Sequence, residues 1–224
     1  EALAILAGDA LLTDAFAVAS AAEVSDIASV RNGIRILSEC AGSLGMVGGQ
    51  VLDIMSEERT LTEQEVLDIQ SRKTGKLISI ACCLGVIAAG GSKHQLEAAG
   101  KFASNLGLAF QIRDDMLDYA GTDSVGKPLG VDILEQKITM PLLGALRNVS
   151  EQEQSRVRAM VKDIVGQPEL RDDVVNFVKA NGGLEYSVLR LNEYVDAAVR
   201  ALDVLPASAE KNFLVQLAHY TAKR

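Results

Sequence analysis

The spacing of the apolar residues restricts the fold of this chain more than any other feature. Near the carboxyl end, apolar residues recur every three or four positions, at Leu184, Val188, Leu191, Val195, Ala198 and Leu202. This spacing places them on one face of a helix that packs on one side. Alternating segments rich in Val, Ile, Tyr and Thr, as strands require, do not recur, and the chain has only four prolines. The sequence therefore predicts a nearly all-α protein with this stripe in the core.

Capping boxes mark several helix starts, since a Ser or Thr is followed three residues later by an acid or amide that can reach back to the backbone. The pairs are Thr62 with Glu65, Ser92 with Gln95, and Ser150 with Glu153. Glycine and proline breaks between them predict about eight to ten helices in one domain over residues 1–224. Within one helical pattern, four glycines cluster at Gly42, Gly45, Gly48 and Gly49. A tight helix crossing and room for a ligand both explain them.

Charge and cysteine usage exclude several classes of protein. The net charge of −8 argues against binding to a nucleic-acid backbone, which requires clustered Lys and Arg. Two of the three cysteines are adjacent, at Cys82 and Cys83, which argues for reduced, buried thiols and a cytoplasmic protein. The longest uncharged run, 77–92, is shorter than the ~20 apolar residues of a membrane helix, so we expect a buried core helix there and no membrane span.

Three acidic residues stand close together in the otherwise apolar segment 106–118. On a helix, Asp114 and Asp115 lie four and three residues before Asp118, so the three carboxylates share one turn. Repulsion between them grows next to apolar neighbours, and a hard divalent cation would offset it. Mg²⁺ suits such a site, because it binds one or two carboxylates and completes its shell with water and phosphate. A solvated acidic helix face is the alternative.

Isolated cations favour the metal interpretation. Lys73, Lys127 and Lys137 each stand in acidic or apolar segments. Each by itself is typical of a solvated lysine, but together they could bind the diphosphate that a metal also contacts. The chain lacks the residue spacings of zinc, di-iron and P-loop sites, and with only two histidines it does not suggest a histidine-driven nucleophile.

Six segments in order resemble the trans-prenyltransferases, the polyprenyl diphosphate synthase family. They are Gly8 to Thr13, Gly48 to Asp53, Lys73 to Leu77, Phe110 to Asp118, Gly126 to Asp132 and Lys137 to Leu142. Phe110 to Asp118 is similar to the second aspartate-rich motif of that family with its preceding Gln. The resemblance covers most of residues 1–145, and the remainder matches mainly in helical character.

This resemblance implies an antiparallel helical bundle around a central cavity, a homodimer, and Mg²⁺-dependent condensation of an allylic diphosphate with isopentenyl diphosphate. It assigns metal binding to Asp114, Asp115 and Asp118, with Asp132 as an outer partner. It assigns contacts with the allylic diphosphate to Lys73, Lys127 and Lys137, and positioning of the reacting groups to Thr74 and Gln111. Gln50 and Asp53 would line the same pocket.

The sequence departs from the family pattern in two respects. The first aspartate-rich motif belongs before Gly8 and Asp9, so we expect the domain to lack an N-terminal part that carries half of the metal site. The segments up to residue 77 resemble the short-chain branch of the family, whereas Gly126 to Leu143 and the long tail resemble the medium- and long-chain branch, so the length of the product stays open. A class I terpene cyclase and a non-catalytic helical subunit of a heteromeric synthase are the alternative functions, although the retained carboxylates and lysines argue for the enzyme.

Overall fold

The computed structural model describes residues 2–23, 26–56, 59–120 and 130–223. Helices account for most of these residues, and no strand occurs among them. The elements are α1 (Ala2–Ser20), α2 (Ile27–Ala41), α3 (Met46–Met55), α4 (Glu63–Gln70), η1 (Ser71–Gly75), α5 (Lys76–Ala88), α6 (Lys93–Ala120), α7 (Val131–Leu134), α8 (Met140–Leu146), α9 (Glu151–Asp163), α10 (Leu170–Ala180), α11 (Gly183–Ala201), η3 (Leu202–Val204) and α12 (Ala209–Lys223). The predicted all-α class is confirmed. The helices in the described ranges outnumber the predicted eight to ten, because short helices such as α7 and α8 span too few turns to produce a recognisable period.

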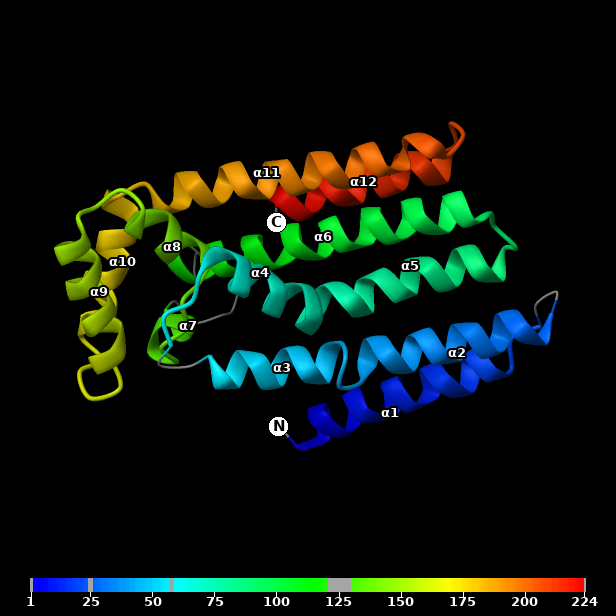
Figure 1. Cartoon of the computed structure of the whole chain (residues 1–224), viewed down its shortest axis with the longest axis horizontal. Coiled ribbons are helices and arrows are strands. Elements are labelled where there is room, and N and C mark those ends of the chain that lie inside the picture. The colour runs from blue at the N-terminus through cyan, green and yellow to red at the C-terminus, as the bar shows by residue number, and fades with distance from the viewer. Residues whose placement is uncertain (1, 24–25, 57–58, 121–129, 224) are drawn as a thin grey trace.

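The long helices form a layered bundle, and the short ones gather at one of its ends. In Figure 1, α5, α6, α11 and α12 run side by side along the long axis, and α2 and α3 follow each other along one edge beside α1. At the left end of the same view, α9 and α10 stand across the bundle next to α7 and α8. Two of the three predicted capping boxes occur: Thr62 and Glu65 bond reciprocally at the start of α4, and Ser92 and Gln95 do so before α6. At α9, Ser150 accepts the Glu153 N–H, but the Glu153 carboxylate bonds to Arg156 instead of reaching back.

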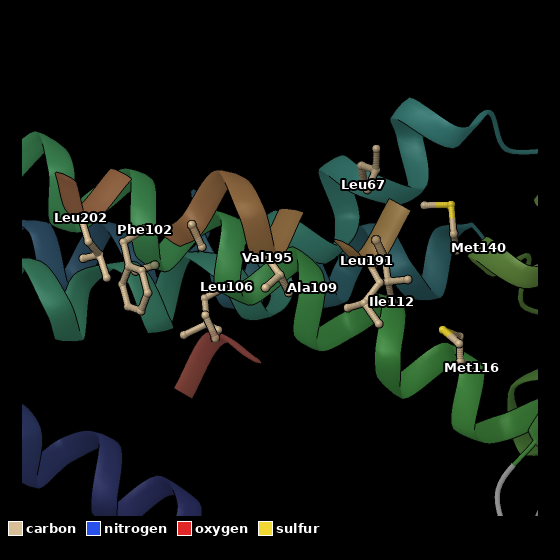
Figure 2. Close-up of a cluster of buried hydrophobic side chains, with 13 residues drawn as sticks. Leu67, Phe102, Leu106, Ala109, Ile112, Met116, Met140, Leu191, Val195 and Leu202 are labelled. Atoms are coloured by element: carbon tan, nitrogen blue, oxygen red, sulfur yellow. The ribbon is translucent and has the colours of Figure 1, made fainter. Parts of the chain in front are cut away.

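The main core lies where α6 packs against α11. Figure 2 shows Phe102, Leu106 and Ile112 of α6 with Leu191 and Val195 of α11 in one cluster of buried side chains. This confirms most of the predicted stripe.

Val188 is the exception within the stripe, because it is exposed. Ser187 takes the buried position instead, and its hydroxyl donates a hydrogen bond to the Gly183 carbonyl. A helix of 3.6 residues per turn brings residue 187, four positions before Leu191, onto the buried face, so a polar residue can occupy it once its hydroxyl is bonded.

The segment 77–92 is not the buried core helix that its composition predicts. It forms α5 only as far as Ala88, and Ile80 is the one residue of that helix classed as buried. α5 packs on α6 and α2, while small residues such as Gly85 leave other parts of its surface open. The prediction of buried cysteines is also wrong in degree, since all three thiols are free but only half-buried.

α1 is exposed along its whole length, with no buried residue. Of the helices in the described part of the chain, it alone is long and apolar enough to cross a membrane by length and composition. Core helices and signal sequences satisfy the same criterion, and α1 carries Asp9 and Asp14. The absence of a membrane span therefore stays a prediction.

The glycine cluster divides between a helix break and a helix crossing. Gly42 and Gly45 lie between α2 and α3, while Gly48 and Gly49 belong to α3. A Cβ atom on Gly49 would lie 2.3 Å from the backbone nitrogen of Lys73, in η1. The backbones of α3 and η1 therefore touch at Gly49, which supports the tight crossing at this position.

We expect Gly49→Ala to destabilise the protein by about 1–3 kcal/mol, because the methyl group must push two backbones apart. Gly85→Ala is the matched control, since a Cβ there meets no atom within 4 Å, and it is expected to raise stability by up to about 1 kcal/mol. Urea unfolding of both variants measures the difference. Equal midpoints for Gly49→Ala and the unmodified protein would disprove the crossing argument.

Candidate active site

A cleft of about 300 Å³ opens among α3, α4, α6 and the segment 131–139. Residues from distant parts of the sequence line it, and seven of them are among the predicted site residues: Asp53, Lys73, Gln111, Asp114, Asp115, Asp132 and Lys137. The structure thus brings most of the predicted site into one place.

Lys73 and Thr74 are presented to the cleft region by η1, a single π-helical turn between α4 and α5. The Lys76 N–H bonds to the Ser71 carbonyl, five residues back, and this widens the turn. Gly75 in the same turn lies directly against α6, since a Cβ on Gly107 would be 2.7 Å from its Cα. The glycine pair lets the two backbones approach closely. This approach brings the Thr74 hydroxyl within 2.8 Å of Gln111 Oε1, to which it donates a hydrogen bond.

Two lysines and three acids form a continuous charged group along one side of the cleft. Lys73 Nζ lies 2.6 Å from Asp53 Oδ2, and the ammonium of Lys137 lies 3.9 Å from the same oxygen. Lys137 also lies 3.8 Å from Asp132 and 2.5 Å from Glu135. Burial lowers the pKa of Lys137, but the hydrogen bond to Glu135 and the charges of Asp53 and Asp132 outweigh this effect and raise it overall. Both lysines therefore line the cleft with carboxylates as their present partners.

Asp114 and Asp115 enter the cleft from α6. Asp115 is only 6% exposed, and its Oδ2 accepts hydrogen bonds from Gln70 Nε2 at 2.9 Å and from the Met140 N–H at 3.2 Å. Burial is the main reason that the pKa of Asp115 is raised to about 8. The charges of Asp132 and Asp114 also raise this pKa, whereas the two hydrogen bonds lower it. Asp115 therefore holds a proton near neutral pH in the ligand-free chain.

This raised pKa makes stability depend on pH. Between the ordinary value of 3.8 and about 8, the folded chain binds one more proton at Asp115 than the unfolded chain does. The stability of the metal-free protein relative to Asp115→Asn is therefore expected to fall as pH rises, by up to ~1.4 kcal/mol per unit, and to level off above pH 8. Urea unfolding of both proteins from pH 5 to 9 checks this. Parallel curves would contradict it.

Asp118 does not line the cleft with its two neighbours. It is 2% exposed, and its two carboxylate oxygens accept hydrogen bonds from the Val131 and Asp132 backbone N–H groups, at 2.9 and 3.1 Å. These are the first N–H groups of α7, so Asp118 caps that helix from a distance in sequence. No group of three His, Cys, Asp or Glu close enough to hold a metal occurs in the described ranges. The three carboxylates thus share a turn but do not converge on one point.

Two predicted site residues lie elsewhere or outside the described structure. Gln50 is exposed on α3 and does not line the cleft. Gly49 and Asp53 are four residues apart and share the face turned to η1, whereas Gln50 is about 100° away on the helix. Lys127 falls within residues 121–129, outside the described residues.

The cleft also contains residues that the sequence analysis missed. Gln70, Glu135 and Thr139 all line it. Thr139 shares a hydrogen bond of 3.1 Å with the buried Tyr119 hydroxyl, which lies one turn beyond Asp115 on α6. No local spacing identifies Gln70 or Thr139, because each bonds to a partner far away in the chain, and the local pair of Glu135 with Lys137 does not by itself indicate a cleft.

Comparison with known proteins identifies the family of the chain. The polyprenyl synthetase family model matches residues 1–179, and the chain belongs to this family. Farnesyl diphosphate synthase of Bacillus subtilis is 37% identical over 179 residues, which are 78% of this chain and 60% of that protein. Geranylgeranyl pyrophosphate synthase of Geoglobus acetivorans is 34% identical over 223 residues, 99% of this chain and 67% of that protein. The chain thus spans 60% and 67% of these two relatives.

Solved structures have the same all-α fold over the whole chain. Geranylgeranyl pyrophosphate synthetase from Pyrococcus horikoshii has a TM-score of 0.85 and 28% identity, covering 100% of this chain and 68% of that one. A polyprenyl synthase from Caulobacter crescentus has a TM-score of 0.82 and 28% identity, over 100% of this chain and 66% of that one. The latter was crystallised with calcium and isoprenyl diphosphate.

Proposed function

We propose that this chain takes part in prenyl chain elongation, in which isopentenyl diphosphate adds to an allylic diphosphate. The observation that carries the proposal is the cleft itself, where Asp114 and Asp115 of α6 line the same cavity as Lys73 and Lys137. Carboxylates and ammonium groups around one cleft suit a ligand made of divalent cations and a diphosphate. Membership of the polyprenyl synthetase family supports the same reaction.

The described residues fit a divalent metal. Asp114 and Asp115 supply hard oxygen donors on one wall, and Mg²⁺ needs only one or two protein carboxylates when phosphate and water complete its shell. Asp115 would lose its proton on binding, since carboxylates bind metal in the ionised form. The polyprenyl synthase from Caulobacter crescentus, which was crystallised with calcium, supports a divalent cation. We propose Mg²⁺, with Asp132 close by and Asp118 holding α7 in place.

The side chains of the cleft would each contribute to loss of the diphosphate group. The metal ion would stabilise the charge on the departing diphosphate. Lys73 and Lys137 would exchange their carboxylate partners for phosphate oxygens. These ammonium–phosphate interactions would strengthen as negative charge develops on the leaving group. Thr74 and Gln111, which are joined by a hydrogen bond, would help to position the reacting groups. Apolar side chains at the cleft, such as Ile69 and Val131, would reduce access of water to a carbocation.

An incorporation assay tests the proposal. The full chain is incubated with labelled isopentenyl diphosphate and allylic diphosphates of increasing length, with Mg²⁺ or with excess EDTA. We expect a longer prenyl diphosphate only when both substrates and Mg²⁺ are present. Consumption of the allylic substrate alone would indicate a cyclase, and binding without turnover would indicate a non-catalytic subunit. Either result would overturn the proposal.

A homodimer in the cytoplasm is part of this proposal. The exposed apolar side chains of α1, including Leu3, Leu11 and Val18, support an interface between copies. An apolar groove of about 480 Å³ between α1, α2 and α5 supports the same assignment.

A further inference from the structure

Gln70 is a buried polar residue at the cleft that none of the recognised motifs includes. It is the last residue of α4, it is 6% exposed, and it lines the cleft directly before η1. Its amide nitrogen donates to Asp115 Oδ2, 45 residues further along the chain. A polar side chain in this position joins α4 to the acidic turn of α6.

The hydrogen bonds of Asp115 are arranged on one side of its carboxylate. Gln70 Nε2 and the Met140 N–H both donate to Oδ2. None of the hydrogen bonds found among the described residues involves Oδ1. Within the described residues, the carboxylate of Asp115 is therefore held through Oδ2, and Asp115 itself lines the cleft.

Stability alone does not account for Gln70. Its carbonyl oxygen, Oε1, is buried and has no hydrogen-bond partner within the described part of the chain. A buried polar atom without a partner costs free energy, and an apolar side chain of the same size avoids this cost. A residue that is unfavourable for the fold and bonded to a cleft carboxylate is typical of a functional position.

We propose that Gln70 is a positioning residue that fixes the orientation of Asp115, so that Oδ1 is directed to a divalent cation held with diphosphate. The inference rests on the proposed function and adds a residue to it. Gln70 acts through Asp115 and does not touch the reacting atoms. Groups that orient a metal ligand in this way typically change metal affinity by 10- to 100-fold when they are removed.

The test measures Mg²⁺ affinity and stability in the same variants. Calorimetric titration of the full chain with Mg²⁺, in saturating inorganic diphosphate, gives the affinity, and urea unfolding gives the stability. Gln70→Met keeps the size of the side chain and removes its donor. We expect its Mg²⁺ affinity to fall about tenfold, with an unfolding midpoint equal to or above that of the unmodified protein. Gln64→Met, on the exposed face of the same helix, is expected to change neither quantity.

Gln70→His separates donation from packing, because an imidazole N–H can take the place of the amide donor. We expect it to retain most of the Mg²⁺ affinity. Unchanged affinity in Gln70→Met would overturn the inference, and so would a loss in Gln70→His as large as in Gln70→Met. If Gln70→Met does not fold, a structural role is indicated and the inference fails. Absence of Mg²⁺-dependent diphosphate binding in the unmodified protein would instead overturn the proposed function itself.

Discussion

Replacement of Asp114 by Ala is expected to lower the rate of condensation at least a hundredfold while the fold stays intact. Asp114 lines the cleft beside Asp115, at the point where we propose that a metal meets the diphosphate. Loss of a metal ligand removes several kcal/mol of stabilisation from the charge that develops on the leaving group, and each ~1.4 kcal/mol is a factor of ten in rate. Turnover of isopentenyl and allylic diphosphates under saturating Mg²⁺ measures the effect.

The stability of Asp114→Ala distinguishes a functional loss from misfolding. The negative charge of Asp114 adds to the forces that raise the pKa of Asp115, so removing it relieves repulsion. In the absence of ligand we expect the variant to be as stable as the unmodified protein or slightly more stable. Glu97→Ala is the control, since Glu97 is an exposed acid on the same helix. Unchanged turnover in Asp114→Ala would refute the metal site.

Replacement of Lys73 by Gln is expected to lower kcat/KM for the allylic diphosphate by roughly 10- to 100-fold, since a hydrogen bond to a charged group contributes about 1.5–3 kcal/mol. Lys73 Nζ lies 2.6 Å from Asp53 in the ligand-free chain, and the side chain is one third exposed. A diphosphate entering the cleft offers it a partner of higher charge. Gln keeps most of the length of the side chain but loses the charge, so the larger part of the effect is expected in KM.

Lys76→Gln is the matched control for this prediction. Lys76 begins α5, three residues beyond Lys73, and is exposed to solvent. Its replacement is expected to leave both kinetic constants within about twofold of the unmodified protein, as is usual for a screened surface charge. If the two variants lost activity equally, the contribution of Lys73 would be a general effect of net charge and not a contact with the substrate.

Local periodicity accounts for what the sequence predicted correctly. Four residues of the stripe in 184–202 are buried, namely Leu191, Val195, Ala198 and Leu202, because their spacing follows the turn of one helix. Asp114 and Asp115 lie within one turn of α6, and both line the cleft. Thr62 starts α4 through its own capping box. Each of these outcomes depends on neighbours within about four residues, and such short-range geometry is present in the sequence itself.

Long-range contacts account for what the sequence could not show. Residues that share a turn can be given different partners by distant segments: Asp118 caps α7, 13 residues away, while Asp115 bonds to Gln70 and Met140. The ion pairs that the lysines form with Asp53 also depend on residues that are distant in the sequence. No spacing predicts that the ammonium groups of Lys73 and Lys137 both approach Asp53.

The sequence by itself therefore determined the helical class, the family and seven of the residues that line the cleft. The tertiary structure decided which of those side chains share the cleft. It turned Gln50 away from the cleft, gave Asp118 to the start of α7 and brought Gln70 to Asp115. The physical reason is that a helical period specifies only the direction of a side chain from its own axis. The partner that it meets depends on how the other helices pack, and here that packing includes the close backbone contact at Gly49.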